Sequence, residues 1–356
     1  MWSSTGRMNK HKLDILIIKL SAIGDVVHSL PLLEVLRGRF PASRIDWVIE
    51  EAASNIVEGH PDLDELIVFP RKSLLERCIK KGEYVNVGRE LITFFRELRR
   101  REYHVVIDLQ GLLKSGVLTF IARGSRKIGL NGAREGSSVF VKEQVSFPGP
   151  EIHALDRYLC VAKHLGVADP VWNGKIPIYD TDKRYVDDLL VGLEVNRALV
   201  AINPMAKWES KLWDLERFAC LADVINKDLG AAIIFTGSET DKIAIEKIVA
   251  GMRTKALNLA GKTNLKQLAY LYQKCMVVVS TDTGPMHMAA AMGSSVVAIF
   301  GPTSPLRTGP YGRKHRVVGA GLPCSPCFKK SCDHMSCMKG IPVEQVFEKV
   351  KEVIDI

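Results

Sequence analysis

The sequence has no run of about 18 apolar residues, which is the length that a membrane-spanning helix requires. Residues 1–12 are polar and basic and contain no apolar core, so they do not resemble a secretory signal. We therefore expect no membrane span and no export. Residues 1–12 are expected to form a disordered leader, with Met8 as an alternative start.

The common phosphate-binding fingerprints are also missing. There is no G-x-x-x-x-G-K-[ST] and no well-placed G-x-G-x-x-G, which excludes a P-loop and the usual dinucleotide site. Asp282-Thr283-Gly284 is not a metal-binding D-x-D sequence. We expect no cofactor and no metal held by protein carboxylates.

The composition is that of a globular protein with an anionic partner. The chain has 356 residues, 47% of them hydrophobic, and a net charge of +9. This length allows two domains, and the charge favours a nucleotide phosphate, a nucleic acid or an anionic lipid surface. The eight cysteines of a chain without an export signal are expected to be reduced.

Short apolar runs alternate with helical patterns in two series. The expected strands are residues 13–20, 45–49, 65–69, 103–108 and 127–129, then 199–203, 231–236, 276–280 and 295–300. This alternation predicts an α/β fold of two doubly wound domains facing each other across a cleft. We place an N-terminal domain at 13–175, a C-terminal domain at 176–341 and a final helix at 342–356.

The stretch from Met276 to Gly312 is the most informative. It predicts a buried strand, a loop Thr281-Asp282-Thr283-Gly284, a helix capped by Thr283 or Gly284 with Pro285 in its first turn, and another strand. The loop follows the carboxyl end of a strand and opens a helix, the place where α/β sheets bind phosphates. Lys207 and Lys211 follow an earlier strand, and Glu239 follows another, so cations and a ribose-binding carboxylate are expected nearby.

An analogous loop in the first half runs from Ser21 to Asp25. Two roles are open for Asp25. It is either a structural N-cap or, at the carboxyl end of the first strand, a general base that the helix dipole keeps ionised.

Residues 71–101 hold ten Lys or Arg against four Glu, a local charge of +6. Leu91, Phe94, Phe95 and Leu98 fall at helical spacing. The segment is either a solvated helix face or a basic amphipathic element near an acidic membrane surface or acceptor. A nucleic-acid site is less favoured, because aromatic residues for base stacking are not evident.

Several of these motifs together resemble glycosyltransferase family 9, the bacterial heptosyltransferases. The resemblance rests on STDTGPMHMAAAMG, GPTSP and TGPYG near the C-terminus, on IKLSAIGDVVH at 18–28, and on KWESKLW at 207–213, which is similar to the K-x-W motif of the family. IDWVIEE at 45–51 and IDLQGLLKS at 107–115 resemble the member that adds the first heptose to the lipopolysaccharide inner core.

The resemblance implies a GT-B fold, ADP-heptose as donor, Kdo–lipid A as acceptor and an inverting single displacement. It implies that Asp25 is the base and that Lys211 neutralises the departing diphosphate. It further implies a cytoplasmic enzyme that is peripheral at the inner face of the inner membrane. We expect a monomer that does not bind nucleic acid. The implied substrate-binding residues are Ser21, Gly24, Lys207, Glu239 (with Asp241 or Lys242 as alternatives for ribose), Thr263 near adenine, Asp282, Thr283, Gly284 and His287.

Two departures keep alternatives open. Ala206-Lys207 stands where the first-heptose member has hydroxyl residues beside the phosphates, and Cys324, Cys327, Cys332 and Cys337 form a group typical of no common zinc site. Both features favour a second or later heptose. A sugar-nucleotide epimerase on the same fold and a zinc- and nucleic-acid-binding module are the more remote alternatives.

Overall fold

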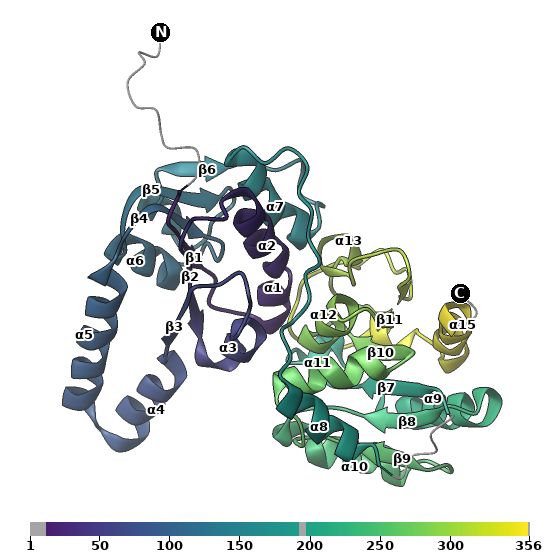
Figure 1. The fold of residues 1–356 in the computed structure, drawn as a ribbon. Helices are drawn as coiled ribbons and strands as arrows, with labels where there is room; N and C mark the ends of the chain where they lie inside the picture. The colour runs from purple at the N-terminus through teal and green to yellow at the C-terminus, as the bar shows by residue number, and fades with distance from the viewer. Residues whose placement is uncertain (1–11, 192–196, 355–356) are drawn as a thin grey trace. The chain divides into compact units, whose positions relative to one another are not determined.

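The structure, a computed structural model, describes residues 12–191 and 197–354 as two compact units (Figure 1). The first unit is built from residues up to 149 and from 155–174, and the second from 150–154 and from 175 onward. Each has one six-stranded sheet of parallel strands, which confirms the predicted α/β class with two doubly wound halves. Apart from Lys12, the predicted leader and the alternative start at Met8 lie outside the described residues.

The sheet of the first unit has the order β3-β2-β1-β4-β5-β6. Its strands are β1 (Ile15–Ile18), β2 (Ile45–Glu50), β3 (Glu65–Phe69), β4 (Glu102–Asp108), β5 (Arg123–Leu130) and β6 (Glu143–Val145). The helices that follow in this part of the chain are α1 (Ile23–Val27), α2 (Leu30–Arg39), α3 (Glu51–Val57), α4 (Arg71–Lys81), α5 (Tyr84–Arg100), α6 (Leu113–Ile121), the 3-10 turn η1 (Ser137–Phe140) and α7 (Ala154–His164).

Strand β1 lies at the centre of this sheet, and all four of its residues are buried. Ile15 is paired with Ile45 of β2 on one side and with Val105 of β4 on the other. A strand covered at both edges and on both faces is apolar throughout, which explains the run ILII. Because all the strands are parallel, the loops after β1, β2 and β4 meet at one edge of the sheet.

The sheet of the second unit has the order β12-β11-β10-β7-β8-β9. Its strands are β7 (Leu199–Asn203), β8 (Ala232–Phe235), β9 (Ala256–Asn258), β10 (Val277–Thr281), β11 (Ser295–Ile299) and β12 (Arg316–Val318). The helices are α8 (Asp180–Leu189), α9 (Leu215–Leu229), α10 (Lys242–Ala250), α11 (Leu265–Lys274), α12 (Gly284–Ala291), α13 (Pro305–Thr308), α14 (Ser336–Lys339) and α15 (Val343–Ile354), with 3-10 turns η2 (Glu209–Lys211) and η3 (Glu239–Asp241).

Most elements lie where the sequence predicts them, and the differences have local causes. The basic helical region is two helices, because Gly82 takes a left-handed conformation (φ 64°) that ends α4. Pro31 lies in the first turn of α2, so the chain restarts after Ser29 and does not kink. The strands β6, β9 and β12 were not predicted, because three residues carry too little periodicity to be recognised.

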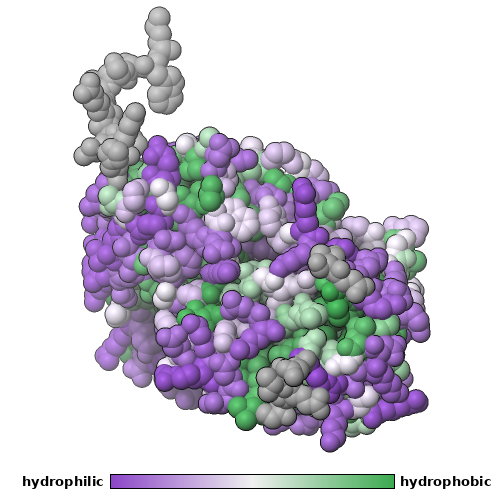
Figure 2. Space-filling model, turned by 45° about the vertical axis from the view of Figure 1, so that its right-hand side comes forward, coloured by the Kyte–Doolittle hydropathy of each residue, from purple (hydrophilic) through white to green (hydrophobic). Residues whose placement is uncertain are grey.

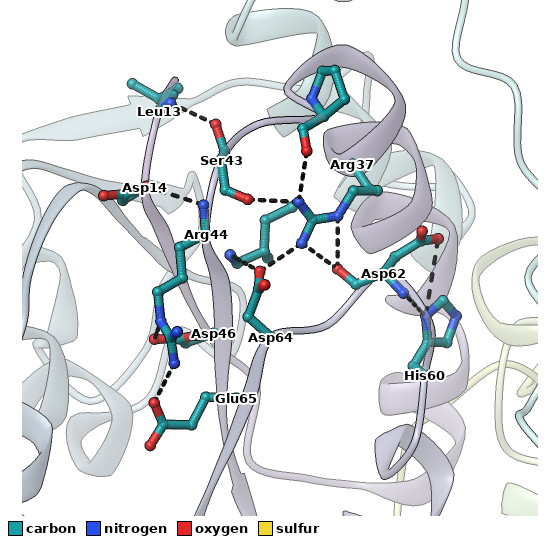
Figure 3. Close-up of polar contacts among 12 residues, drawn as sticks. Leu13, Asp14, Arg37, Ser43, Arg44, Asp46, His60, Asp62, Asp64 and Glu65 are labelled. Atoms are coloured by element: carbon teal, nitrogen blue, oxygen red, sulfur yellow. Dashed lines mark hydrogen bonds and ion pairs between the residues drawn. The ribbon is translucent and has the colours of Figure 1, made fainter. Parts of the chain in front are cut away.

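A polar network joins the amino ends of β1, β2 and β3 (Figure 3). Arg37 donates to the carbonyl oxygens of Ser43 (2.5 Å) and Asp62 (2.9 Å) and to the Asp64 carboxylate (2.6 Å). The Asp64 carboxylate also accepts from the N–H of Ile45 (2.7 Å). This network ties the loops before β2 and β3 together, at the end of the sheet opposite the carboxyl-end loops.

Hydrophilic residues cover most of the face drawn in Figure 2, with apolar residues gathered in smaller areas. Among residues 12–191 and 197–354, no helix is both long enough and apolar enough to cross a membrane.

Candidate active site

An ion pair lies at the carboxyl end of β10 in the second unit. The Nζ atom of Lys211 is 2.6 Å from Oδ2 of Asp282 and donates a further hydrogen bond to the Asp282 carbonyl oxygen (3.2 Å). The hydroxyl of Thr303 donates to the same Oδ2 at 2.6 Å. Asp282 is only 5% exposed. The structure thus joins three loops, after β7, β10 and β11, on one buried carboxylate.

Helix α12 begins directly after this carboxylate. Thr283 is its N-cap residue and Pro285 lies in its first turn, as the sequence predicts. The first backbone N–H groups of such a helix have no partner within the helix and favour an anion. His287, on the same helix, is buried, and burial together with the nearby charges of His153 and Lys211 lowers its pKa to about 3. Its ring is therefore neutral at physiological pH.

The loop that carries Lys211 is held in place by hydrogen bonds to a segment close to the C-terminus. The Ser210 hydroxyl donates to the carbonyl oxygen of Lys329 (2.7 Å), and its N–H to that of Lys330 (3.3 Å). The Lys211 ammonium lies 4.6 Å from the centre of the Trp208 ring, a cation–π contact. Lys207 is exposed on this loop. The K-x-W motif therefore packs around Lys211 and leaves Lys207 at the surface.

The cysteine-rich segment supports the loop on which Thr303 lies. The N–H groups of Cys327 and Phe328 donate to the Pro302 carbonyl oxygen (3.0 and 2.7 Å), and the Ser325 hydroxyl donates to that of Gly301. All eight cysteines are free thiols. Within the described parts of the chain, no three His, Cys, Asp or Glu side chains are grouped as metal ligands.

Glu239 and Thr263 lie at the carboxyl ends of the neighbouring strands β8 and β9. A Cβ atom at Gly261 would come within 1.9 Å of Glu239 Oε2, so the glutamate side chain lies against the loop that leads to Thr263. The Asp241 carboxylate accepts hydrogen bonds from the Ser238 hydroxyl (2.6 Å) and N–H (2.8 Å). Asp241 is thus engaged in a turn, whereas Glu239 is largely exposed.

In the first unit, Asp25 is the third residue of α1, and Gly24 is buried beside it. Asp25 is therefore not the N-cap itself, although its Oδ2 accepts from the N–H of Ala22 (3.4 Å). The same Oδ2 is 3.5 Å from Nζ of Lys19, which is almost fully buried. Burial alone would lower the pKa of Lys19, but Asp25 and Tyr158 outweigh it and raise the pKa.

The loop before Asp25 is fixed by its neighbours at the same sheet edge. The side-chain oxygen of Gln110 accepts from the N–H groups of Leu20 (3.3 Å) and Ser21 (3.1 Å). Lys114 donates to the Ser21 hydroxyl (3.2 Å) and to the Glu50 carboxylate (2.7 Å). These contacts hold Ser21 in place directly before α1, the helix that carries Gly24 and Asp25.

The comparison with protein families identifies the chain. The family model described as "Glycosyltransferase family 9 (heptosyltransferase)" matches residues 91–337, which is more than half of the sequence. The chain belongs to glycosyltransferase family 9.

Relatives of this family 9 glycosyltransferase include both heptosyltransferase types. It is 30% identical to "Lipopolysaccharide heptosyltransferase 1" of Pseudomonas aeruginosa, over 90% of this chain and 87% of that protein. It is 28% identical to "Lipopolysaccharide heptosyltransferase 2" of Escherichia coli, over 85% and 87%. Among solved structures, a family 9 glycosyltransferase from Veillonella parvula has a TM-score of 0.82 at 26% identity, covering 99% of both chains. The E. coli heptosyltransferase WaaC with ADP has a TM-score of 0.74 at 25% identity, covering 96% and 100%.

These comparisons confirm the resemblance to the family, the glycosyltransferase class and the GT-B fold. Sequence reasoning about this family 9 glycosyltransferase missed Thr303, Lys19 and Gln110 as partners of the site. Lys19 carried a signal, because a lysine inside the apolar run LDILIIKL is rarely buried without a partner. No sequence pattern indicated Thr303 or Gln110, because each forms its hydrogen bonds with residues that are distant in the sequence.

Proposed function

We propose that this enzyme transfers a heptose from ADP-heptose to the inner core of lipopolysaccharide. The observation that carries the proposal is a row of charged and polar residues after the strands at one edge of the second sheet. Asp282 and Lys211 follow β10 and β7, Glu239 follows β8, and Thr263 follows β9. These four strands are consecutive in the sheet. The related proteins are named as heptosyltransferases of lipopolysaccharide, which supports the same activity.

The width of this row suits a nucleotide diphosphate. Three inter-strand spacings of ~4.8 Å each span ~14 Å, which accommodates base, ribose and diphosphate side by side. We infer that the diphosphate lies at the N-terminus of α12, next to Lys211 and with Thr283 and Gly284 donating, and that His287 and Asp282 contact the heptose side. Glu239 would then accept from the ribose hydroxyls, with Lys242 beside it, and the backbone near Thr263 would touch adenine. Lys207 would approach the phosphates from the surface. WaaC has been solved with ADP, which supports an adenine nucleotide as donor.

The reaction that we infer is an inverting single displacement. The acceptor hydroxyl oxygen forms a bond to the anomeric carbon as the bond from that carbon to the diphosphate oxygen breaks. The hydroxyl proton passes to the Asp25 carboxylate, and the negative charge that develops on ADP is stabilised by Lys211 and the helix N-terminus. Ser21 and Gly24 line the acceptor side of the loop around Asp25.

Lys19 and Tyr158 are the positioning residues for this base. The Lys19 ammonium lies 5.1 Å from the centre of the Tyr158 ring and donates to the Leu109 carbonyl oxygen (3.4 Å). Both contacts keep Lys19 in place beneath Asp25. These contacts hold the Lys19 ammonium 3.5 Å from Oδ2 of Asp25 and so fix the orientation of the carboxylate.

We propose Kdo–lipid A as the acceptor, reached from the cytoplasmic face of the inner membrane by a monomeric enzyme. The alternative acceptor is a core that already carries one heptose, the substrate of the second enzyme type. An assay of ADP-heptose with each acceptor separates the two. Faster transfer to the singly heptosylated core would overturn the first-heptose assignment, and transfer to neither would overturn the lipopolysaccharide acceptor.

Lys211→Ala tests the donor site. We expect weaker ADP binding and a lower turnover rate, because the diphosphate loses its cation while the buried Asp282 loses the Lys211 ammonium that pairs with its charge. Lys247→Ala on α10 is the matched control, since Lys247 is exposed on the same unit. Equal ADP affinity and turnover in the two variants would remove Lys211 from the site.

A further inference from the structure

Helices α4 and α5 form a hairpin that extends beyond the sheet of the first unit (Figure 1). Arg77 holds the two helices together, because its guanidinium pairs with Glu83 (2.9 Å) and, through two hydrogen bonds, with Glu90 (2.7 and 2.8 Å). Leu74 of α4 and Val87 of α5 are buried. The hairpin is therefore a rigid projection.

The hairpin exposes large apolar side chains near its turn. Ile79, at the end of α4, is 81% exposed, and Tyr84 and Val85, at the start of α5, are each 70% exposed. Leu75 and Ile92 extend this area along the two helices. Five exposed large apolar residues within thirty positions form a patch for which solvent is a poor environment.

Cations surround this patch. Lys72, Lys80, Lys81, Arg89 and Arg96 are exposed, and none has an ion pair in the part of the chain that the structure describes. On α5 the order Val85, Arg89, Ile92, Arg96 follows helical spacing, so apolar and cationic side chains share one face. A helix face of this composition binds the interface of an anionic bilayer, where apolar groups enter the acyl boundary and cations meet phosphates.

The base of the hairpin lies at the catalytic edge of the same sheet. Arg71, the first residue of α4, donates to the Glu50 carboxylate (2.7 Å), which also accepts from Lys114, the partner of Ser21. Hydrogen bonds from both cations outweigh burial and lower the pKa of Glu50, so this link is ionic. The eleven residues of α4 span ~16 Å at 1.5 Å per residue, which is the length of the helix between this link and the hairpin turn.

We propose that the tip of the α4–α5 hairpin docks on the surface of a bilayer that contains anionic lipids. The proposal rests on the proposed transfer to a lipid-linked acceptor and deepens it, because docking there would hold the first unit at the surface that carries such an acceptor.

Sedimentation with lipid vesicles tests this surface on the full chain. Wild type should bind vesicles of phosphatidylglycerol and phosphatidylethanolamine, bind phosphatidylcholine vesicles at least tenfold more weakly, and be released by 0.5 M salt. Lys80→Glu with Lys81→Glu should lower the partition coefficient at least tenfold, since each cation near an anionic surface contributes about fivefold. Ile79→Ser with Val85→Ser should lower it severalfold at any salt concentration.

Ile243→Ser with Lys247→Glu on α10 is the matched control, because Ile243 is 70% exposed and Lys247 is exposed on a helix outside the hairpin. The control should bind vesicles as wild type does. Equal binding by wild type and the hairpin variants would overturn the proposal. So would a dimer of the wild type that the hairpin variants abolish, since the patch would then contact a second copy.

Transfer to a de-acylated, water-soluble acceptor separates this proposal from the proposed function. The hairpin variants should keep full activity on that acceptor while losing activity on vesicle-borne acceptor. Loss of activity on both would place the hairpin in sugar recognition and overturn docking. If wild type transfers to neither acceptor but still binds vesicles through the hairpin, the proposed function fails and the docking surface stands.

Discussion

Replacing Thr303 by valine removes one hydrogen-bond donor from the Asp282 carboxylate and nearly keeps the shape of the side chain. Thr303 and Asp282 are both buried, and the bond between them is 2.6 Å long. A hydrogen bond to a charged group contributes ~1.5–3 kcal/mol to the free energy of unfolding. The unfolding temperature of the second unit should fall by roughly 3–12 °C, given 2–4 °C per kcal/mol for a unit of this size.

The same substitution should also lower the affinity of the donor site for ADP. Asp282 would keep Lys211 as a side-chain partner but lose the Thr303 hydroxyl, and the ammonium and the first turn of α12 would lose part of their alignment. If all of this energy appears in donor binding, the affinity for ADP falls by about 10- to 150-fold. Titration calorimetry with ADP measures this directly.

Thr303→Ser is the control for this prediction. Serine keeps the hydroxyl and removes one methyl group, so it should cost about 1 kcal/mol in stability and change ADP affinity only a few-fold. Valine and serine variants with the same ADP affinity would refute the reasoning, because the Thr303 hydroxyl would then do nothing for the site.

Three further outcomes are expected. Asp25→Asn should lower turnover at least ~100-fold and leave ADP affinity unchanged, because it removes the base and no proposed donor contact. In His287→Gln, the unfolding free energy should fall less between pH 6.5 and pH 3 than it does in the wild type. The depressed pKa of His287 (about 3) gives a stabilisation that is complete above pH 6.5 and is lost as the pH falls towards 3. Arg37→Met should lower the unfolding free energy by about 2 kcal/mol through lost hydrogen bonds, and exposed Arg39→Met by less than about 0.5 kcal/mol.

Each of these three predictions has a result that would contradict it. Normal turnover in Asp25→Asn would remove the proposed base. An acid unfolding curve for His287→Gln that is parallel to wild type would mean that this ring is protonated in the folded state. Equal stability of the Arg37 and Arg39 variants would mean that the network in Figure 3 does not hold the loops.

Local features of the structure could be read from the sequence. The helix start at Thr283 and Pro285, the restart of the chain at Pro31 and the buried strand Ile15–Ile18 all follow from residues within one or two turns of each other. The two parallel sheets could be predicted as well, because their strands alternate with helices. The division of the basic region at Gly82 could not, since a glycine is compatible with a continuous helix as well as with a left-handed end.

The sequence by itself determined the order of most strands and helices, the family motifs and the segments that carry Asp25, Lys211 and Asp282. Only the tertiary structure decided which of these side chains meet, since 71 positions separate Lys211 from Asp282 and 21 separate Asp282 from Thr303. The physical reason is the parallel sheet. Each connection passes through a helix before the next strand, so groups at one edge are distant along the chain, and periodicity reports only the faces of single elements.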